Sequence, residues 1–207
     1  MGDPFDNPDM NSYMSLREAW VQQRPLVIDS GREYRRDAQR REALRTLVTR
    51  PGDVLERHRR DVRAGADVVT TATWGIAAAS WESPDPDRWM TVARRGVRLA
   101  RLAIAAQKRV GKVAVAFSID ATHEIPGDGD TFKRLARTVA AESPDMVILE
   151  ARSARQPALE QTVRSLEAAR LPLWLSLPRA PRSIEWLEQR GKRTRLVDQG
   201  LLEITRW

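Results

Sequence analysis

The stretch VLERHRRDVRAGADVVTTATWG, residues 54–75, decides the fold that the sequence predicts. Its first half places apolar side chains at helical spacing, and Gly65 follows where a left-handed residue commonly ends a helix. Residues 67–71 are then short, apolar and β-branched, as in a strand that is covered on both faces. The stretch therefore predicts one helix, a tight turn and one buried strand.

The carboxyl end of this strand carries the first candidate site residues, Thr71 and Trp74. In a barrel of alternating strands and helices, ligands bind at the carboxyl ends of the strands. Both residues are therefore candidates for substrate binding. The alternative is that Thr71 only hydrogen-bonds locally and that Trp74 only packs.

The composition indicates a soluble, single-domain protein. The 207 residues are enough for a sizeable core, and 42% hydrophobic with 30% charged residues is an ordinary balance. No apolar run is long enough to cross a bilayer, and the acidic, polar residues 1–14 contain no signal-peptide core. We expect a cytoplasmic protein in which residues 1–14 are disordered and residues 15–207 fold, with a capping box of Ser15 and Glu18 opening the first helix.

The positive charge of the chain is spread rather than concentrated. The net charge is +7 and the pI is about 10.6, values that invite a nucleic-acid hypothesis. Arginines supply most of the charge, and the densest cluster, residues 35–45, is interleaved with Asp37 and Glu42. Such clusters are usually solvated helix faces, and no aromatic stacking motif accompanies them. The pattern argues against nucleic-acid binding.

Strands and helices alternate along the whole chain. Continuously apolar strands joined by helices are typical of a parallel sheet, either a barrel or an open doubly wound layer. No glycine-rich phosphate loop follows any strand. The expected strands are residues 26–29, 67–71, 113–117, 146–150 and 173–177, with two short ones at 195–197 and 202–204. The expected helices are residues 15–23, 33–48, 54–63, 87–109, 131–142, 158–169 and 182–190, and residues 77–86 are expected to form a loop.

The order of several motifs resembles the homocysteine-binding domain of the homocysteine S-methyltransferases. Residues 28–31, IDSG, are similar to the family's first strand, which ends in Asp-Gly. Residues 51–74 are similar to its P-x-x-V/I-x-x-x-H-x-x-Y-x-x-A-G-A-D-x-x-x-T-N-T-F motif. Residues 113–119 resemble its V-A-G-S-I-G strand, Glu150 follows Leu149 where the family has Glu-Thr, and residues 173–177 resemble its P-x-W-x-S-x strand.

The resemblance implies a (β/α)₈ TIM barrel that binds homocysteine and moves a methyl group onto its sulfur. It also implies that acids after the first and fourth strands, here Asp29 and Glu150, help to hold the substrate ammonium, with Thr71 lining the same pocket. Two carboxylates at strand ends are suited to this, because they accept charge-assisted hydrogen bonds from one ammonium. The alternative for each acid is a helix N-cap or a surface ion pair.

One essential part of the family's chemistry is missing from this sequence. The family holds zinc with three cysteines, and zinc makes the substrate thiolate near neutral pH, but this chain contains no cysteine. His58 lies in a predicted helix and is interpreted as a packed or capping residue. A weak metal site at His123, beside Glu124 and Asp128, is the open alternative, but it lacks a soft third ligand. We therefore expect no cofactor.

The sequence thus predicts an α/β fold, an incomplete TIM-like barrel of about five to six βα units that is truncated against the family's eight. An open strand edge favours pairing, so we expect a homo-oligomer or a complementing chain. Two functional hypotheses follow. The first is a protein that binds homocysteine or a related amino acid and is inactive alone or dependent on a zinc-bearing partner. The second is a non-enzymatic scaffold or regulator descended from that family.

Overall fold

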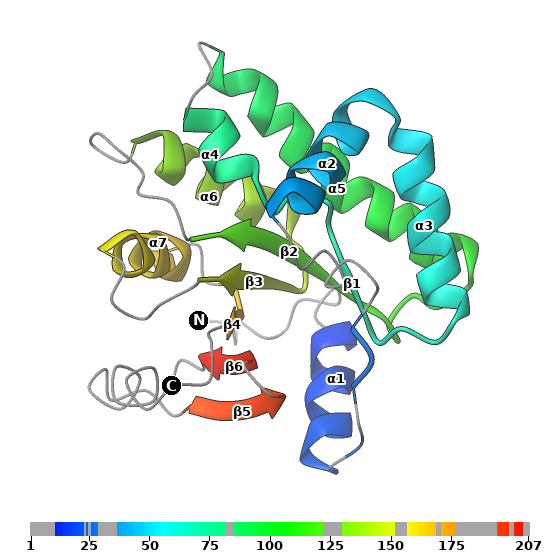
Figure 1. Ribbon diagram of the computed structural model, residues 1–207. Coiled ribbons are helices and arrows are strands. Elements are labelled where there is room, and N and C mark those ends of the chain that lie inside the picture. Colours follow the sequence, from blue (N-terminus) through cyan, green and yellow to red (C-terminus); the bar gives the residue numbers. More distant parts are fainter. Residues whose placement is uncertain are drawn as a thin grey trace.

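The computed structural model describes residues 11–22, 24, 26–28, 37–81, 85–121, 130–151, 157–168, 171–176, 194–198 and 201–204. These residues form one six-stranded sheet in the order β1-β2-β3-β4-β6-β5 (Figure 1). Neighbours among β1 to β4 pair in parallel, whereas β6 pairs antiparallel with both β4 and β5. The strands are β1 (Val68–Thr70), β2 (Ala114–Asp120), β3 (Met146–Glu150), β4 (Leu173–Ser176), β5 (Thr194–Asp198) and β6 (Leu201–Ile204).

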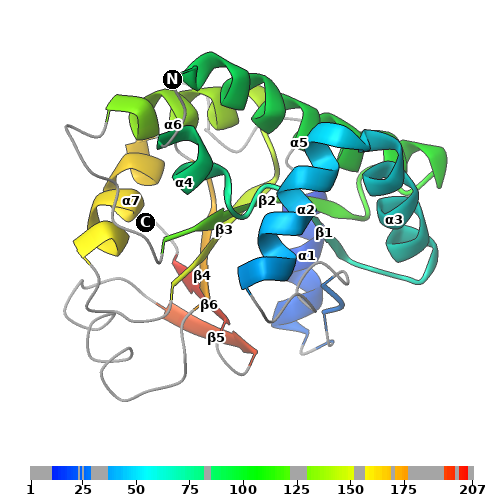
Figure 2. The same ribbon diagram turned by 45° about the horizontal axis from the view of Figure 1, so that its top comes forward.

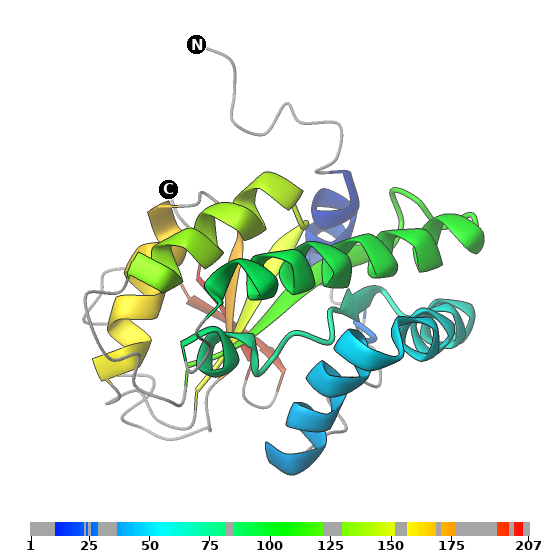
Figure 3. The ribbon, with the colours of Figure 1, turned by 90° about the horizontal axis from the view of Figure 1, so that it is seen from above.

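The helices form a layer over one face of the parallel strands, and a single described helix lies on the other side. Viewed from above, α5 and α6 run side by side across the sheet, with α2, α3 and α4 beside them (Figure 3). Helix α1 contacts β2 from the opposite side (Figure 1). The helices are α1 (Asn11–Val21), α2 (Asp37–Thr49), α3 (Pro51–Arg63), α4 (Ile76–Trp81), α5 (Pro86–Ala106), α6 (Asp130–Glu142) and α7 (Pro157–Ala168).

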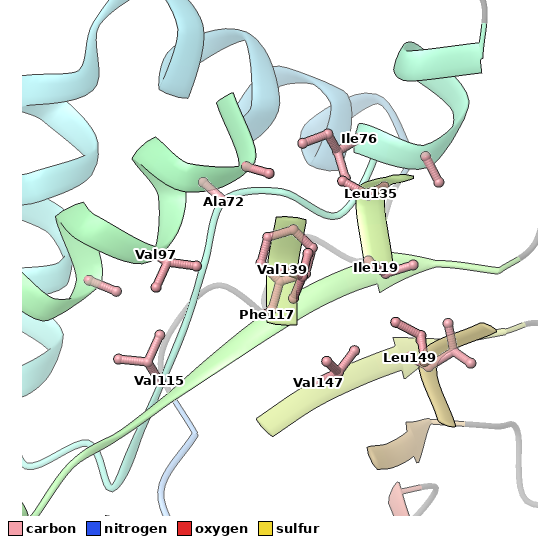
Figure 4. Packing of buried hydrophobic residues seen from close by; sticks show 14 of the residues in the cluster. Ala72, Ile76, Val97, Val115, Phe117, Ile119, Leu135, Val139, Val147 and Leu149 are labelled. Atoms are coloured by element: carbon pink, nitrogen blue, oxygen red, sulfur yellow. The ribbon is translucent and has the colours of Figure 1, made fainter. Parts of the chain in front are cut away.

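Successive side chains of β2 face opposite sides of the sheet and belong to two separate core clusters. Val115, Phe117 and Ile119 pack under the helical layer with side chains such as Leu135 and Val139 of α6 (Figure 4). Ala114 and Ala116 belong to the second cluster, on the opposite face of the sheet, which we call the inner face. This cluster also includes Tyr13 and Leu16 of α1, Val68, Met146, Ile148 and Trp174. The two small alanines leave room for the larger α1 side chains. All seven residues of β2 are buried, as the apolar strand pattern predicts.

The parallel strands and their helical crossovers confirm the predicted α/β class and form a partial TIM-barrel-like fold. Strand β3 has the predicted bounds, and Gly65 has a φ of +99°, as expected for the left-handed residue after α3. Of the predicted first strand, Ile28 forms a parallel bridge with Val68, and Asp29 lies outside the described residues. The predicted helix at residues 182–190 also lies outside them.

Several predicted boundaries are wrong, among them the start of α3, which is Pro51 instead of Val54, and the end of α5, which is Ala106 instead of Arg109. Helix α1 begins at Asn11, so residues 11–14, predicted to be disordered, form its first turn; residues 1–10 lie outside the described part of the chain. Ser15 is therefore within the helix, because burial of Tyr13 and Leu16 against the sheet outweighs the capping-box signal. Residues 76–81 form the short helix α4 where a loop was expected, and its Ile76 is fully buried. Strand β2 continues to Asp120, three residues past its predicted end.

The tail forms a hairpin at the far end of the sheet. Strands β5 and β6 confirm the two short predicted strands, and β6 pairs with the outer edge of β4 (Figure 2). A register irregularity interrupts the β5–β6 pairing between Leu196 and Asp198.

Asp67 connects the first strand segment to the rest of the sheet. Its carboxylate accepts a hydrogen bond of 2.8 Å from Arg24 Nη2 and one of 2.9 Å from the backbone N–H of Val27. The backbone N–H of Asp67 donates in turn to Val27 O. Asp145, just before β3, acts in the same way by accepting the backbone N–H of Val115 at 2.7 Å. An aspartate before a strand thus fixes the adjacent strand's start in both places.

We expect Asp67→Asn to lower the free energy of unfolding by about 1–3 kcal/mol, because it weakens hydrogen bonds of a carboxylate that is only 7% exposed. Urea denaturation measures the change. Glu56→Gln on α3 is the matched control, since Glu56 also pairs with an arginine, Arg59, but is 63% exposed. Its cost should stay within about 0.5 kcal/mol. Equal effects of the two changes would contradict the role of Asp67.

Candidate functional site

The parallel register brings polar residues of three strands into one row. Asp120 at the end of β2 is the register partner of Glu150 at the end of β3, and Glu150 is the partner of Ser176 at the end of β4. Because these strands are parallel, all three residues lie at the carboxyl edge of the sheet. This is the edge at which βα barrels bind their ligands.

The row lies on the inner face of the sheet. Ser118 and Asp120 alternate in phase with Ala114 and Ala116 of the inner cluster, and both are about 95% buried. Ser118 Oγ donates to Glu150 Oε1 at 3.5 Å, so the Glu150 carboxylate extends along the same face toward β2. The inner face is therefore apolar where α1 covers it and polar at its carboxyl end.

Two threonine hydroxyls replace the backbone ladder where β1 ends. Thr71 N donates to Ala116 O at 2.9 Å, as in a regular parallel pair. The next two bonds involve Ser118: its N–H donates to Thr71 Oγ1 at 3.2 Å, and its carbonyl accepts from Thr73 Oγ1 at 2.9 Å. The two hydroxyls are 2.6 Å apart. Since the Thr73 hydroxyl donates to a carbonyl, Thr71 is the donor between them, and the chain of bonds closes on Ser118.

Helix α5 packs closely against this arrangement. A Cβ atom added at Gly96 would lie 2.7 Å from Thr73 Cγ2, and the hydrogen bonds of Thr73 restrict its movement away. Thr71 is 3% exposed and Thr73 is fully buried. The Thr71 hydroxyl is thus engaged both locally, with Thr73, and across to Ser118, where it holds the end of β1 against β2.

Trp74 bonds to the carboxyl end of β2 through its backbone. Its carbonyl accepts the backbone N–H of Asp120 at 2.9 Å, and its side chain is 6% exposed. Of the four predicted site residues, Thr71, Trp74 and Glu150 therefore gather around the carboxyl end of β2. Thr71 and Glu150 both contact Ser118, one through the Ser118 backbone and the other through its hydroxyl. Asp29, the fourth, lies outside the described residues.

Sequence reasoning missed Ser118, Asp120 and Ser176 as members of this site. The predicted strand stopped at Phe117, which left Ser118 and Asp120 outside it. The usable signal was the continuing alternation in Phe117-Ser118-Ile119-Asp120, in which apolar residues face the helices and polar residues face inward.

The donor groups of the described residues do not fit the zinc ion that the family resemblance implies. The chain contains no cysteine, and the described residues include no group of three His, Asp or Glu side chains able to hold a metal ion. His58 is fully buried on α3, where burial, followed by the nearby charge of Arg57, lowers its pKa from 6.5 to about 3. This supports its predicted role as a packed residue. His123 lies outside the described residues.

The fold and the polar strand ends define a protein with a partial βα-barrel fold and a candidate ligand site at the carboxyl edge of its parallel strands. The family model of homocysteine S-methyltransferase matches residues 20–189. The chain belongs to the homocysteine S-methyltransferase family.

Solved structures agree with this fold. The homocysteine methyltransferase MmuM from Escherichia coli aligns with a TM-score of 0.56 in its oxidized form and 0.55 in its metallated form, each at 19% identity. The alignments cover 78% of this chain but only 65% and 66% of the MmuM chain, so this chain spans about two thirds of that protein. The comparison with curated proteins gave no match. No helix within the described residues has the length and hydropathy to cross a membrane.

We expect His58 to make stability depend on pH. The unfolded histidine binds a proton near pH 6.5 and the folded one only near pH 3, so its contribution is fully present above pH 6.5 and is lost as the pH falls. The free energy of unfolding should fall by up to about 1.4 kcal/mol per pH unit between these values. Urea denaturation from pH 7 to 4 should show a shallower decline for His58→Leu than for the wild type. His123→Gln changes the chain's other histidine and is the control.

Proposed function

We propose that this protein binds homocysteine or a related amino acid at the carboxyl edge of β1 to β3. The observation that carries the proposal is Glu150, an acid at the end of β3 whose carboxylate lies along the inner face beside Ser118, in a chain of this family. Glu150 accepts a hydrogen bond from the substrate ammonium, and Asp29 provides a second acceptor. Trp74 and Thr71 complete the proposed set of substrate-binding residues.

The surrounding contacts support a preorganised site. The Ser118 hydroxyl orients Glu150, and the threonine hydroxyls fix Ser118 through both of its backbone groups. Thr71 therefore acts mainly by holding the strand end, because its hydroxyl is already engaged. A site whose acceptor is held before the ligand arrives loses less conformational entropy on binding.

We further propose that the chain does not transfer a methyl group on its own. Methylation of a thiol requires a thiolate, and the cysteines that hold the family's activating zinc are missing. Activity would require a partner that supplies the metal site. The same observation favours a second candidate function, a scaffold or regulator that retains the fold without catalysis. The proposed location of either is the cytoplasm.

Calorimetric titration of homocysteine tests the binding proposal. A hydrogen bond to a charged group contributes about 1.5–3 kcal/mol, so Glu150→Gln and Asp29→Asn should each weaken binding by roughly ten- to a hundred-fold. The two changes should not be additive, because the two acids share one ammonium.

Glu142→Gln is the matched control, since Glu142 pairs with Arg94 and Arg98 between α5 and α6, in the layer over the other face. It should leave homocysteine binding unchanged. If the wild type binds and Glu150→Gln binds equally well, the proposed site is wrong. If the wild type releases no heat, the scaffold function is favoured.

The purified protein should contain far less than one zinc ion per chain after dialysis, because it lacks thiolate ligands. Elemental analysis measures the ratio. One zinc per chain would reveal a site built from nitrogen and oxygen ligands.

We also infer that the chain self-associates or pairs with a chain that supplies further βα units. Strand β5 is the last in the sheet order, and its outer side pairs with no other described strand. Sedimentation velocity at micromolar concentration should show a species heavier than 23.5 kDa. A compact monomer that binds no hydrophobic dye would show instead that the tail hairpin suffices to protect the sheet.

A further inference from the structure

The turn between α5 and β2 carries two lysines that the fold itself does not use. Lys108 and Lys112 are exposed, and within the described residues neither side chain takes part in an ion pair or a hydrogen bond. Val110 lies between them and is 72% exposed. Because the turn leads into β2, it lies at the amino edge of the parallel strands, opposite the candidate ligand site.

Backbone hydrogen bonds hold this turn in one conformation. Lys108 and Gly111 both have a positive φ, +53° and +75°. The backbone N–H of Arg109 donates to Ile104 O at 3.1 Å, and that of Lys112 donates to Arg109 O at 3.0 Å. Cations after a helix also stabilise its dipole, but that role leaves both ammonium groups open to a partner. The lysines are therefore presented on a preorganised surface.

Acids of the same edge are already engaged. The connections that lead into the first strand segment and into β1 to β4, residues 22–25, 64–67, 107–113, 143–145 and 169–172, contain only two acids, Asp67 and Asp145. Asp67 binds Arg24, and Asp145 accepts the backbone N–H of Val115. The charge of Lys108 and Lys112 is thus not neutralised by these connections.

The chain contains a segment of complementary charge. Residues 1–10, MGDPFDNPDM, lie outside the described residues and include three aspartates, Asp3, Asp6 and Asp9, with no lysine or arginine. Pro4 and Pro8 favour a polyproline II conformation, which has three residues per turn. In that conformation the three carboxylates share one face and follow one another at about 9 Å.

Helix α1 attaches this segment beside the turn. Ser15 Oγ of α1 donates to Gly111 O at 3.5 Å. Asn11, the first residue of α1, precedes Ser15 by four residues, or about 6 Å along the helix. Since each extended residue spans about 3.3 Å, Asp6 and Asp9 are within reach of the turn. A tether this short also gives the segment a high effective concentration there.

We propose that the turn Lys108–Lys112 is the docking site of this chain's own amino-terminal segment, residues 1–10. The aspartates of the segment pair with the ammonium groups of Lys108 and Lys112. Docking fastens the start of α1, whose Tyr13 and Leu16 cover the inner face, and so keeps that apolar face closed. The proposal does not depend on the proposed function, because it concerns the opposite edge of the sheet.

Zero-length crosslinking with a carbodiimide tests the contact on the wild type. The reagent joins a carboxylate to an ammonium that touches it, and residues 1–17, the first tryptic peptide, contain no acids except the three aspartates. The chain has four lysines, so the attachment site can be assigned. We expect crosslinks to Lys108 or Lys112 and none to Lys133, in the first turn of α6. Their yield should fall severalfold in about 0.5 M salt.

Hydrogen exchange then separates docking from mere proximity of a loose tail. Lys108→Asn keeps a residue that tolerates positive φ, and combined with Lys112→Gln it should make exchange in the first turns of α1 roughly five- to tenfold faster. Asp6→Asn with Asp9→Asn should have the same effect. Joining the two pairs of changes should add little, since they remove the same contacts. Lys133→Gln is the matched control and should leave α1 unchanged.

Several outcomes would overturn the proposal. One is the absence of crosslinks to Lys108 and Lys112, or equal crosslinking of Lys133. Another is unchanged exchange in α1 with either pair of changes, which would leave the lysines to stabilise α5 and the segment disordered, as its composition predicts. A third is crosslinks that join light and heavy chains in a mixture of unlabelled and ¹⁵N-labelled protein, because the occupant would then belong to a second copy.

Discussion

The parallel strands of this protein must be buried on both faces, and most of the structure follows from that requirement. Every residue of β2 is buried, with Phe117 and Ile119 under the helices and the small Ala114 and Ala116 on the inner face. Burying a side chain of leucine size stabilises a fold by about 1.5–3 kcal/mol, so neither face can be left open without a large cost. Helix α1 covers the amino-terminal part of the inner face. Along β2 the cluster that it completes ends at Ala116, and the next residues of β2 on the same face, Ser118 and Asp120, are polar.

At the point where the inner face becomes polar, side-chain hydrogen bonds as well as backbone pairing hold the end of β1 against β2. The regular pairing of β1 with β2 ends at Thr70, yet the chain follows β2 as far as Trp74 because the hydroxyls of Thr71 and Thr73 bond to Ser118. Gly96 lets α5 approach the same point. The strand end is therefore held from both sides, and Glu150 contacts the residue at its centre. The stability of the strand end and the position of the Glu150 carboxylate depend on the same few atoms.

The sequence was sufficient to predict features that local periodicity specifies. The alternation of strands and helices, the left-handed Gly65 and the bounds of β3 all follow from patterns within about ten residues. The start of α1 could not be predicted in this way, because it depends on the packing of Tyr13 and Leu16 against strands that are distant in sequence. The role of the Thr71 hydroxyl depends on Ser118, 47 residues away, and the row of Asp120 and Glu150 depends on strand register. Long-range pairing of this kind is not visible in a single sequence.

The charge of the strand ends also bears on what the family's chemistry would require here. A thiol becomes a nucleophile by losing its proton, and a neighbouring cation favours that loss, whereas a neighbouring carboxylate opposes it. Within strands β1 to β4 themselves, the ionisable residues are Asp120 and Glu150, and the chain has no cysteine with which to hold zinc. The same carboxylates that suit an ammonium would therefore raise the pKa of a bound thiol. Recognition of an ammonium and activation of a thiol make opposite electrostatic demands, and the two acids of these strands meet only the first.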